Sequence, residues 1–175
     1  DGTDDMLQLL ERHGIVHHRE NPFRASGQKP QHAALAAADD EPLISEANWA
    51  LCIDVDEFIN IHAGDGRLDD LYAATAGANL ISMTWRLFGN AGQVRYEDRP
   101  VTETFTRAAP AVMHWPWRAA MFKTLYRNDG TYAKPGVHRP RDPDPARLEQ
   151  TRWFDSHGRP LPDDFKTRRI FSNFG

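Results

Sequence analysis

The segment from Trp49 to Ile59 constrains the fold of this chain more than any other. It begins with five consecutive apolar residues and runs directly into Asp54, Val55 and Asp56. An uninterrupted apolar run of this length predicts a strand that is buried on both faces, as in the middle of a parallel sheet. Ligands of open α/β sheets bind beyond the carboxyl ends of the strands. We therefore expect the functional site where the two aspartates follow this strand.

The chain before this segment shows helical and extended patterns. Residues 3–13 predict a short amphipathic helix, with acidic residues in its first turn and Gly14 at the position of a C-terminal cap. Residues 15–18 are typical of a short strand, and the alanine-rich residues 30–38 predict a second helix. The predicted order in this part is helix, strand, helix.

The chain after this segment is regular at first. Residues 68–75 predict a helix, and residues 80–85 predict a second strand. From residue 100 to 123 the aromatic and β-branched residues follow no clear period, and beyond Pro135 the chain is rich in Pro, Arg and Asp. We expect long functional loops in both of these regions.

The composition excludes one class of partner. The chain has 175 residues, 40% hydrophobic and 26% charged, which is typical of a folded protein and predicts a single domain, 1–175. The net charge of −4, with basic residues scattered among acidic ones, argues against binding to nucleic acid. Phosphate groups would have to be bound locally, through a metal ion or a few placed cations.

The single cysteine, Cys52, permits no disulfide within the chain, and a reducing compartment is the natural expectation. No apolar run approaches the roughly 20 residues that cross a bilayer, and no signal-peptide pattern opens the sequence. We expect a cytoplasmic protein without a membrane span, which could also sit peripherally at the inner membrane. Because the chain starts at Asp1 without Met and stops without a closing element, we expect it to be part of a longer protein.

Asp54 and Asp56 have the spacing of a cation site. Two residues apart on a strand, they would face the same side, and at the strand end both carboxylates can converge on one ion. Mg²⁺ and Mn²⁺ bind carboxylate oxygens and complete their coordination with water and substrate phosphates. The alternative is an exposed acidic turn, which is common after a strand. The apolar run that leads into the pair favours the metal site.

Residues 49–59 resemble the signature of bacterial glycosyltransferases related to family 2, in which Trp and four hydrophobic residues precede Asp-x-Asp-Glu-Phe. Further segments follow in the order of that family, so the resemblance extends over nearly the whole chain. These segments are Asp1–Thr3 at the start of a helix, Pro30–His32, Trp85–Gly89, Lys123–Arg127 and Gly136–Pro140.

The resemblance implies an α/β fold of the GT-A type, a Rossmann-like fold with a mostly parallel central sheet, truncated here at both ends. It implies an inverting transfer of a sugar from a nucleotide-diphosphate donor, UDP- or GDP-linked, to a hydroxyl of a glycan or lipid-linked acceptor. The implied cofactor is Mn²⁺ or Mg²⁺, held by Asp54 and Asp56, with His138 as a candidate third ligand. A loop histidine with no ligand role is the alternative for His138.

The other candidate site residues have structural alternatives. Asp56 and Glu57 are the candidates for catalysis, although a strand end would turn Glu57 away from Asp56 and favour a supporting role for it. Trp85 and Arg86 follow the second predicted strand, where an indole can stack on a sugar and an arginine can bind phosphate. Lys123 could steady the diphosphate, although most such cations are only solvated.

Two other functions remain open. A phosphatase of the haloacid dehalogenase type also has an apolar strand ending in Asp-x-Asp, but its motif does not continue with residues like Glu57 and Phe58. A non-catalytic carbohydrate-binding or interaction domain would use its aromatic residues and hold the aspartates structurally or on Ca²⁺. Ca²⁺ takes about six to eight oxygens, more than one Asp-x-Asp supplies. Trp115 and Trp117 would suit an acceptor surface, or else the core.

Overall fold

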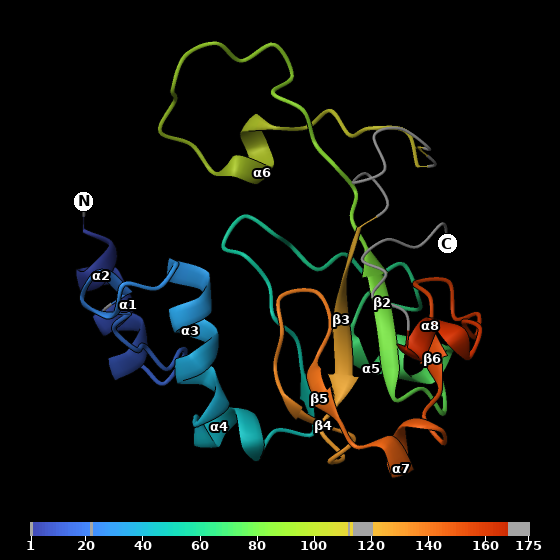
Figure 1. Cartoon of the computed structure of the whole chain (residues 1–175). Coiled ribbons are helices and arrows are strands. Elements are labelled where there is room, and N and C mark those ends of the chain that lie inside the picture. Colours follow the sequence, from blue (N-terminus) through green and yellow to red (C-terminus); the bar gives the residue numbers. More distant parts are fainter. Residues whose placement is uncertain (1, 22, 112, 114–120, 168–175) are drawn as a thin grey trace. The chain divides into compact units, whose positions relative to one another are not determined.

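The computed structural model of the chain describes residues 2–21, 23–111, 113 and 121–167. The chain forms two compact units, Asp1–Asp40 and Glu41–Gly175, and Figure 1 shows both, coloured along the sequence. Every candidate site residue of the described part belongs to the second unit.

The first unit is built from short helices. The predicted helices at 3–13 and 30–38 are confirmed, and Gly14 follows the first of them with a φ of +68°, a value that favours glycine. The predicted strand at 15–18 is wrong, because that segment forms no strand. The helices are α1 (Thr3–Arg12), α2 (Phe23–Ser26) and α3 (Pro30–Asp39).

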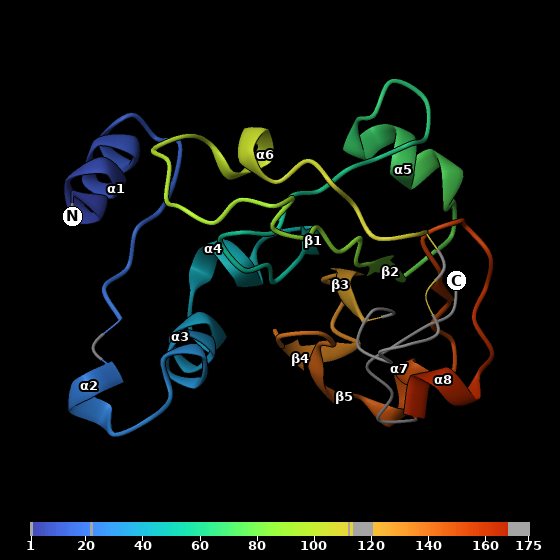
Figure 2. The same cartoon turned by 90° about the horizontal axis from the view of Figure 1, so that it is seen from above.

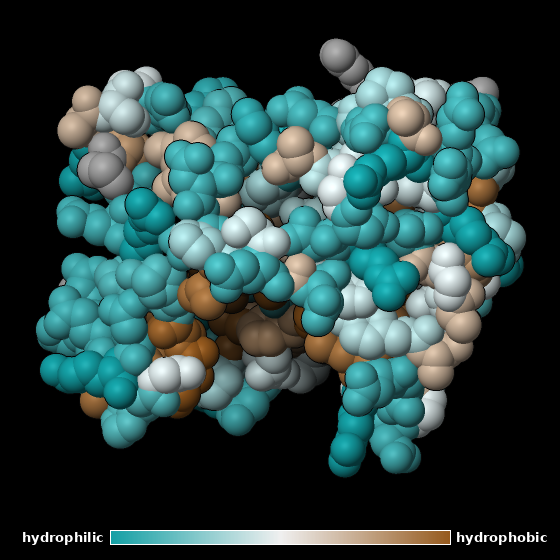
Figure 3. Space-filling view, turned by 90° about the horizontal axis from the view of Figure 1, so that it is seen from below, coloured by the Kyte–Doolittle hydropathy of each residue, from teal (hydrophilic) through white to brown (hydrophobic). Residues whose placement is uncertain are grey.

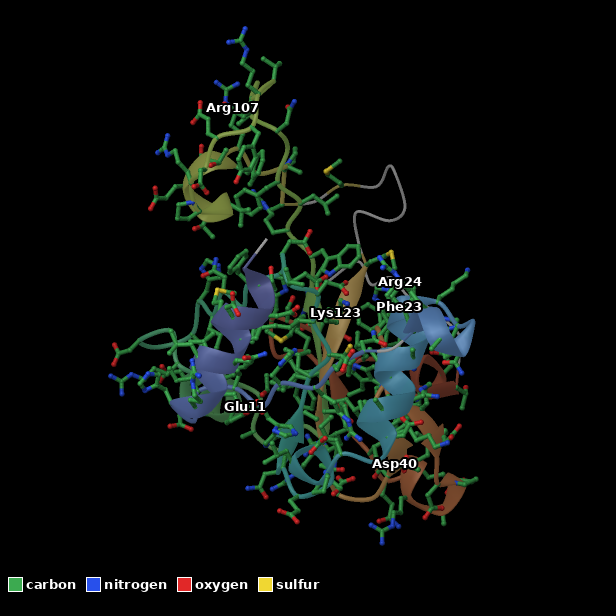
Figure 4. The ribbon with its side chains drawn as sticks, turned by 90° about the vertical axis from the view of Figure 1, so that its left-hand side faces the viewer. Glu11, Phe23, Arg24, Asp40, Arg107 and Lys123 are labelled. Carbon is green, nitrogen blue, oxygen red and sulfur yellow. The ribbon has the colours of Figure 1, made fainter. Side chains whose placement is uncertain are left out.

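Side-chain contacts tie down the segment that follows α1. The Glu11 carboxylate accepts the backbone N–H of His18 at 2.9 Å and lies 3.2 Å from His17 Nδ1. Figure 4 labels Glu11 on α1. It also labels Phe23 and Arg24 on α2, where the guanidinium carbon of Arg24 lies 5.7 Å from the ring centre of Phe23. The apolar pattern of 15–18 therefore marks a connection held by a helix side chain, and no partner strand faces it in the described part of this unit.

The second unit contains a sheet with helices around it. The predicted helix at 68–75 and the predicted strand at 80–85 are confirmed as α5 and β2. Its elements are α4 (Pro42–Ser45), β1 (Trp49–Ala50), α5 (Leu68–Ala74), β2 (Leu80–Thr84), α6 (Val101–Thr104), β3 (Phe122–Arg127), β4 (Tyr132–Lys134), β5 (Arg141–Pro143), α7 (Pro145–Leu148), β6 (Trp153–Phe154) and α8 (Asp164–Thr167).

The main sheet brings the ends of two strands to one edge. Its order is β1-β3-β2-β6, and β4 pairs with β5 in a separate two-stranded sheet. β3 is antiparallel to both β1 and β2, and β2 is parallel to β6. Because β3 lies between β1 and β2 and opposes both, these two strands run in the same direction. Figure 1 shows β2 and β3 running in opposite directions. The residues that follow β1 and β2 therefore lie at the edge of the sheet where β3 begins.

The prediction of a Rossmann-like, mostly parallel sheet of the GT-A type is wrong. Two of the three pairings in the main sheet are antiparallel, and so is the pairing of β4 with β5. The cause is β3, which no sequence pattern predicts: its first two residues fall in the loop expected at 100–123, and Lys123 and Thr124 interrupt its apolar residues. Both side chains are buried in the sheet, where Lys123 is ion-paired and Thr124 is hydrogen-bonded. Paired in this way, polar residues can occupy a central strand.

β1 is also shorter and less buried than the sequence predicts. Only Trp49 and Ala50 pair as a strand, and the apolar run ends with Ile53 46% exposed. The expectation of a strand buried on both faces is therefore wrong for this segment. A turn begins at Asp54, as described below, and it takes the chain out of the extended conformation.

The two faces of the main sheet carry separate hydrophobic cores, because side chains alternate along each strand. Figure 2 shows α5 on one side of the sheet and the β4–β5 pair with α7 and α8 on the other. On the α5 side the buried core consists of Leu71, Ala78, Ile81, Leu125 and Phe154. On the other side it consists of Leu80, Phe122, Tyr126, Tyr132, Trp153 and Phe165.

The surface seen in Figure 3 is largely hydrophilic, with hydrophobic side chains exposed in places. In the second unit the exposed large hydrophobic residues include Val55, between the two aspartates, and Phe58, just after them. Val94 and Tyr96, in the long segment after β2, are also exposed. Within the described residues, no helix combines the length and the apolar character that a membrane crossing requires.

Candidate functional site

Asp54 and Asp56 lie on a tight turn at the end of the first apolar segment. The backbone N–H of Glu57 donates to the carbonyl of Asp54 at 3.0 Å, which closes a four-residue turn with Val55 and Asp56 at its centre. The Glu57 carboxylate in turn accepts the N–H of Asp54 at 2.8 Å. These reciprocal bonds make the turn a closed unit. We call residues 54–57 the acidic turn.

The acidic turn differs from the strand end that the sequence predicts. The two aspartates stand at the first and third positions of the turn, so strand alternation does not set their directions. Asp54, Val55 and Asp56 are all exposed, and Val55 is fully so. The chain therefore presents two carboxylates to solvent at the edge of the sheet where β1 ends, and the site is open.

Lys123, the second residue of β3, is bound to the acidic turn. Its Nζ lies 3.0 Å from Oδ2 of Asp54 and 3.3 Å from Oε2 of Glu57. The lysine side chain is only 4% exposed, against 48% for Asp54 and 19% for Glu57. Figure 4 labels Lys123 near the start of β3. Because β1 is antiparallel to β3, residue 54 reaches the level at which β3 begins.

The environment of Cys52 shows that the charged groups of Lys123, Asp54 and Glu57 lie close together. Burial raises the pKa of the Cys52 thiol above its ordinary value of 9.0; Lys123 lowers it, and Asp54 and Glu57 raise it. The thiol therefore lies within electrostatic reach of all three charged groups. At neutral pH it is protonated and behaves as a small, half-buried apolar residue.

The charges of the acidic turn fit a divalent cation. Asp54, Asp56 and Glu57 carry three negative charges and Lys123 one positive charge, which leaves a formal charge of −2 on these four side chains. Asp56 is exposed and makes no hydrogen bond or ion pair with any residue in the described part of the chain. Carboxylate oxygens with open solvent around them are the ligands that Mg²⁺ and Mn²⁺ accept. Within the same residues, no three His, Cys, Asp or Glu side chains form a group that could hold a metal by themselves.

His138, the predicted third ligand, is attached to the other face of β3. Thr124 donates its hydroxyl to the His138 carbonyl at 2.5 Å, whereas its neighbour Lys123 points to Asp54. Consecutive residues of a strand face opposite sides of the sheet, so the acidic turn and the main chain of His138 are anchored on opposite sides. His138 Nδ1 lies 2.9 Å from the carbonyl of Phe122.

The turn that carries His138 is held tightly to the core. A Cβ on Gly136 would collide with the carbonyl oxygen of Arg139, so only glycine fits there. Arg139 stacks on Trp153 and Phe165, with its guanidinium carbon 4.3 Å and 4.9 Å from the two ring centres. It also donates to the carbonyl of Phe165 at 2.6 Å. Burial lowers the pKa of this arginine, yet the guanidinium stays charged at neutral pH.

Trp85 and Arg86 follow β2 at the same edge of the sheet as the acidic turn, as the sequence predicts. The backbone of Trp85 is fixed by a bond from its N–H to the carbonyl of Met121 at 2.8 Å. Its indole lies 5.6 Å from the His138 ring, and its buried Nε1 has no hydrogen-bond partner within the described residues. Arg86 is exposed. Trp85 is thus partly buried at this edge, while Arg86 reaches solvent.

Trp115 and Trp117, which the sequence suggests for an acceptor surface or the core, lie outside the residues that the structure describes. The segment after β2 turns back on itself, with Phe88 bridged to Ala108 and the N–H of Gly89 bound to the carbonyl of Arg107 at 3.0 Å. Arg107 is labelled in Figure 4 on this segment.

Sequence reasoning missed the ion pairs of the acidic turn. Lys123 is 69 residues from Asp54, and only the pairing of β1 with β3 brings them together. The one available signal was a lysine among apolar residues, because a lysine at such a position needs an acidic partner. Known proteins add no guide to these residues: no protein family, curated protein or solved structure matches the chain.

Proposed function

We propose that this chain belongs to a metal-dependent glycosyltransferase, which moves a sugar from a nucleotide-diphosphate donor to a hydroxyl acceptor with inversion. The observation that carries the proposal is the acidic turn: Asp54 and Asp56 are exposed after β1, at the edge of the sheet where β2 also ends. The resemblance of residues 49–59 to bacterial glycosyltransferases related to family 2 supports the same function.

The proposed roles follow from exposure and contacts. Asp54 and Asp56 would hold Mn²⁺ or Mg²⁺, and the cation would offset the negative charge that develops on the departing diphosphate. Arg86, exposed at the same edge, would bind a phosphate oxygen. Glu57 is engaged by Lys123 and by the amide of Asp54, which favours a supporting role over that of a general base.

The reaction itself is a displacement at the anomeric carbon. The bond from this carbon to the diphosphate oxygen breaks, and the acceptor oxygen forms the new bond on the opposite face of the sugar. The hydroxyl proton of the acceptor passes to a general base, and the electron pair of the broken bond leaves with the diphosphate. An exposed carboxylate turn suits this chemistry because it is open to a large donor and a large acceptor.

The test is a hydrolysis screen, because water can replace the acceptor. The chain is incubated with UDP- and GDP-sugars and Mn²⁺, and release of the nucleoside diphosphate is followed. We expect release with at least one donor, and loss of release when a chelator removes the cation. A Ca²⁺-bound interaction domain would release none from any donor under either condition, and that result would remove the enzyme assignment.

A further inference from the structure

The buried lysine of β3 carries a second inference, which concerns how the acidic turn is held. Lys123 contacts two carboxylates of the turn, at 3.0 Å for Asp54 and 3.3 Å for Glu57, and its side chain is 4% exposed. A cation that bound a substrate phosphate directly would need an open path to solvent. This ammonium group instead lies beneath the turn and points at the residues that form it.

We propose that Lys123 is a positioning residue, which fixes the acidic turn in the shape that accepts a divalent cation and makes no contact with the diphosphate. The Glu57 oxygen atom that contacts Lys123 is the same Oε2 that accepts the N–H of Asp54. Lys123 thus holds Glu57 where it closes the turn, and it holds Asp54 by a second contact. That the turn accepts a cation rests on the proposed function. That Lys123 fixes the shape of the turn does not.

The charge of Lys123 makes the inference testable, because simple electrostatics predicts the opposite result. Removing the ammonium group would change the formal charge of the four side chains from −2 to −3, which by itself attracts a cation more strongly. A loss of cation affinity in spite of this change therefore reports a loss of geometry. Substitution of residues that orient metal ligands weakens metal binding by about 10- to 100-fold.

The first measurement is calorimetric binding of Mn²⁺ to the wild-type chain and to Lys123→Met, without nucleotide and with UDP. We expect at least about tenfold weaker Mn²⁺ binding in the variant, by the same factor in both conditions. If Lys123 were a diphosphate ligand, Mn²⁺ alone would bind as well or better, and only the binding that depends on UDP would weaken. Either unchanged or tighter binding of Mn²⁺ alone would overturn the positioning role.

The matched control is Lys166→Met. Lys166 is also nearly buried, with 9% of its side chain exposed, and pairs with Asp163 at 2.8 Å. The substitution also removes one ammonium group, but on α8, far from the acidic turn in the sequence. We therefore expect Mn²⁺ binding to be unchanged. Lys123→Arg keeps a charged donor that can bind two carboxylates, and we expect it to restore part of the affinity.

The second measurement needs no metal and separates this inference from the proposed function. Amide hydrogen exchange reports the turn directly, because the N–H groups of Asp54 and Glu57 close it. In Lys123→Met we expect both amides to exchange about tenfold faster or more, with no change in Lys166→Met. Equal exchange in wild type and Lys123→Met would refute the positioning role. A wild-type chain that binds neither Mn²⁺ nor UDP would refute the proposed function and leave the exchange result to decide on Lys123.

Discussion

Asp56 is the residue at which the proposed function can be tested with least disturbance to the fold. It is exposed, stands at the centre of the acidic turn and makes no hydrogen bond or ion pair with another described residue. Asp56→Asn removes a charge and creates no cavity, so we expect the free energy of unfolding to change by less than about 0.5 kcal/mol. We expect nucleotide-sugar turnover with Mn²⁺ to fall by about 100-fold or more, the scale found when one group that stabilises developing charge is lost.

The control for this variant is Asp163→Asn. Asp163 is 93% exposed at its side chain and forms a surface ion pair, which contributes little to stability. We expect wild-type turnover in the control and wild-type urea unfolding in both variants. Full turnover in Asp56→Asn would show that this carboxylate holds no essential cation.

Tyr132 offers a test of how polar atoms are satisfied in the core. Its hydroxyl is buried and has no hydrogen-bond partner within the described residues, and burial raises the pKa of Tyr132 to about 12. Tyr132→Phe removes this unpaired group and keeps the ring. We therefore expect the free energy of unfolding, measured in urea, to be unchanged or up to about 1 kcal/mol higher.

The opposite result is expected for Ser82→Ala in the same core. Ser82 is fully buried and accepts the Trp153 Nε1–H at 2.8 Å. The substitution leaves the indole donor without its acceptor, which costs about 1–3 kcal/mol. Of two substitutions that each remove one hydroxyl, only Ser82→Ala should therefore lower the stability. A loss of stability in Tyr132→Phe comparable with that in Ser82→Ala would contradict the assigned contacts.

At the scale of elements, the sequence predicted α1, α3, α5 and β2, where periodic patterns and caps are local properties of the chain. It failed for β3, whose buried Lys123 and Thr124 are satisfied by partners far along the chain. It also failed for 15–18, which has strand-forming residues but no strand to pair with in the described part. Pairing between distant segments is what a local pattern does not contain.

The candidate site was likewise predictable from the sequence only in part. The exposure of Asp54 and Asp56 after an apolar run was predictable from residues that are neighbours in sequence. The shape of the acidic turn was not, because it depends on contacts of Glu57 with Asp54 and of Lys123 with both. The direction of the strands was not predictable either, since it follows from the insertion of β3.

The turn that follows β6 gives a prediction for pH. The buried Asp155 carboxylate accepts the N–H groups of His157 and Arg159 at 2.9 Å each and pairs with the Arg159 guanidinium at 2.6 Å. Burial alone would raise the pKa of Asp155, but these bonds outweigh it, and the pKa lies below the ordinary 3.8. Because the folded state holds the ionised form, this stabilisation is present above pH 3.8 and is lost as the pH falls through the lower, folded-state pKa.

We therefore expect Asp155→Asn to be less stable than wild type at pH 7, by on the order of 1–3 kcal/mol. The difference should narrow as the pH falls from about 4 through the lower pKa of the folded state, below which the wild-type carboxyl group is also neutral. Urea unfolding at several pH values measures both free energies. A difference that stays constant down to pH 2 would contradict the role given to the charge.

At the scale of the whole molecule, the net charge of −4 bears on how a donor can bind. An acidic protein repels a nucleotide diphosphate unless a cation intervenes, so nucleotide and metal should bind together. Reciprocal coupling is required by thermodynamics: a cation that strengthens nucleotide binding is itself bound more tightly when the nucleotide is present. The acidic turn offers two exposed carboxylates on which this coupling can act.

The most direct measurement is the melting temperature of the chain with UDP or GDP, in the presence and absence of Mn²⁺ or Mg²⁺. A ligand at 100 times its Kd adds about 2.7 kcal/mol to the free energy of unfolding. This corresponds to a rise of several degrees for a domain of this size. We predict that UDP or GDP produces such a rise only when Mn²⁺ or Mg²⁺ is also present. A rise with Ca²⁺ alone and no effect of either nucleotide would contradict the account.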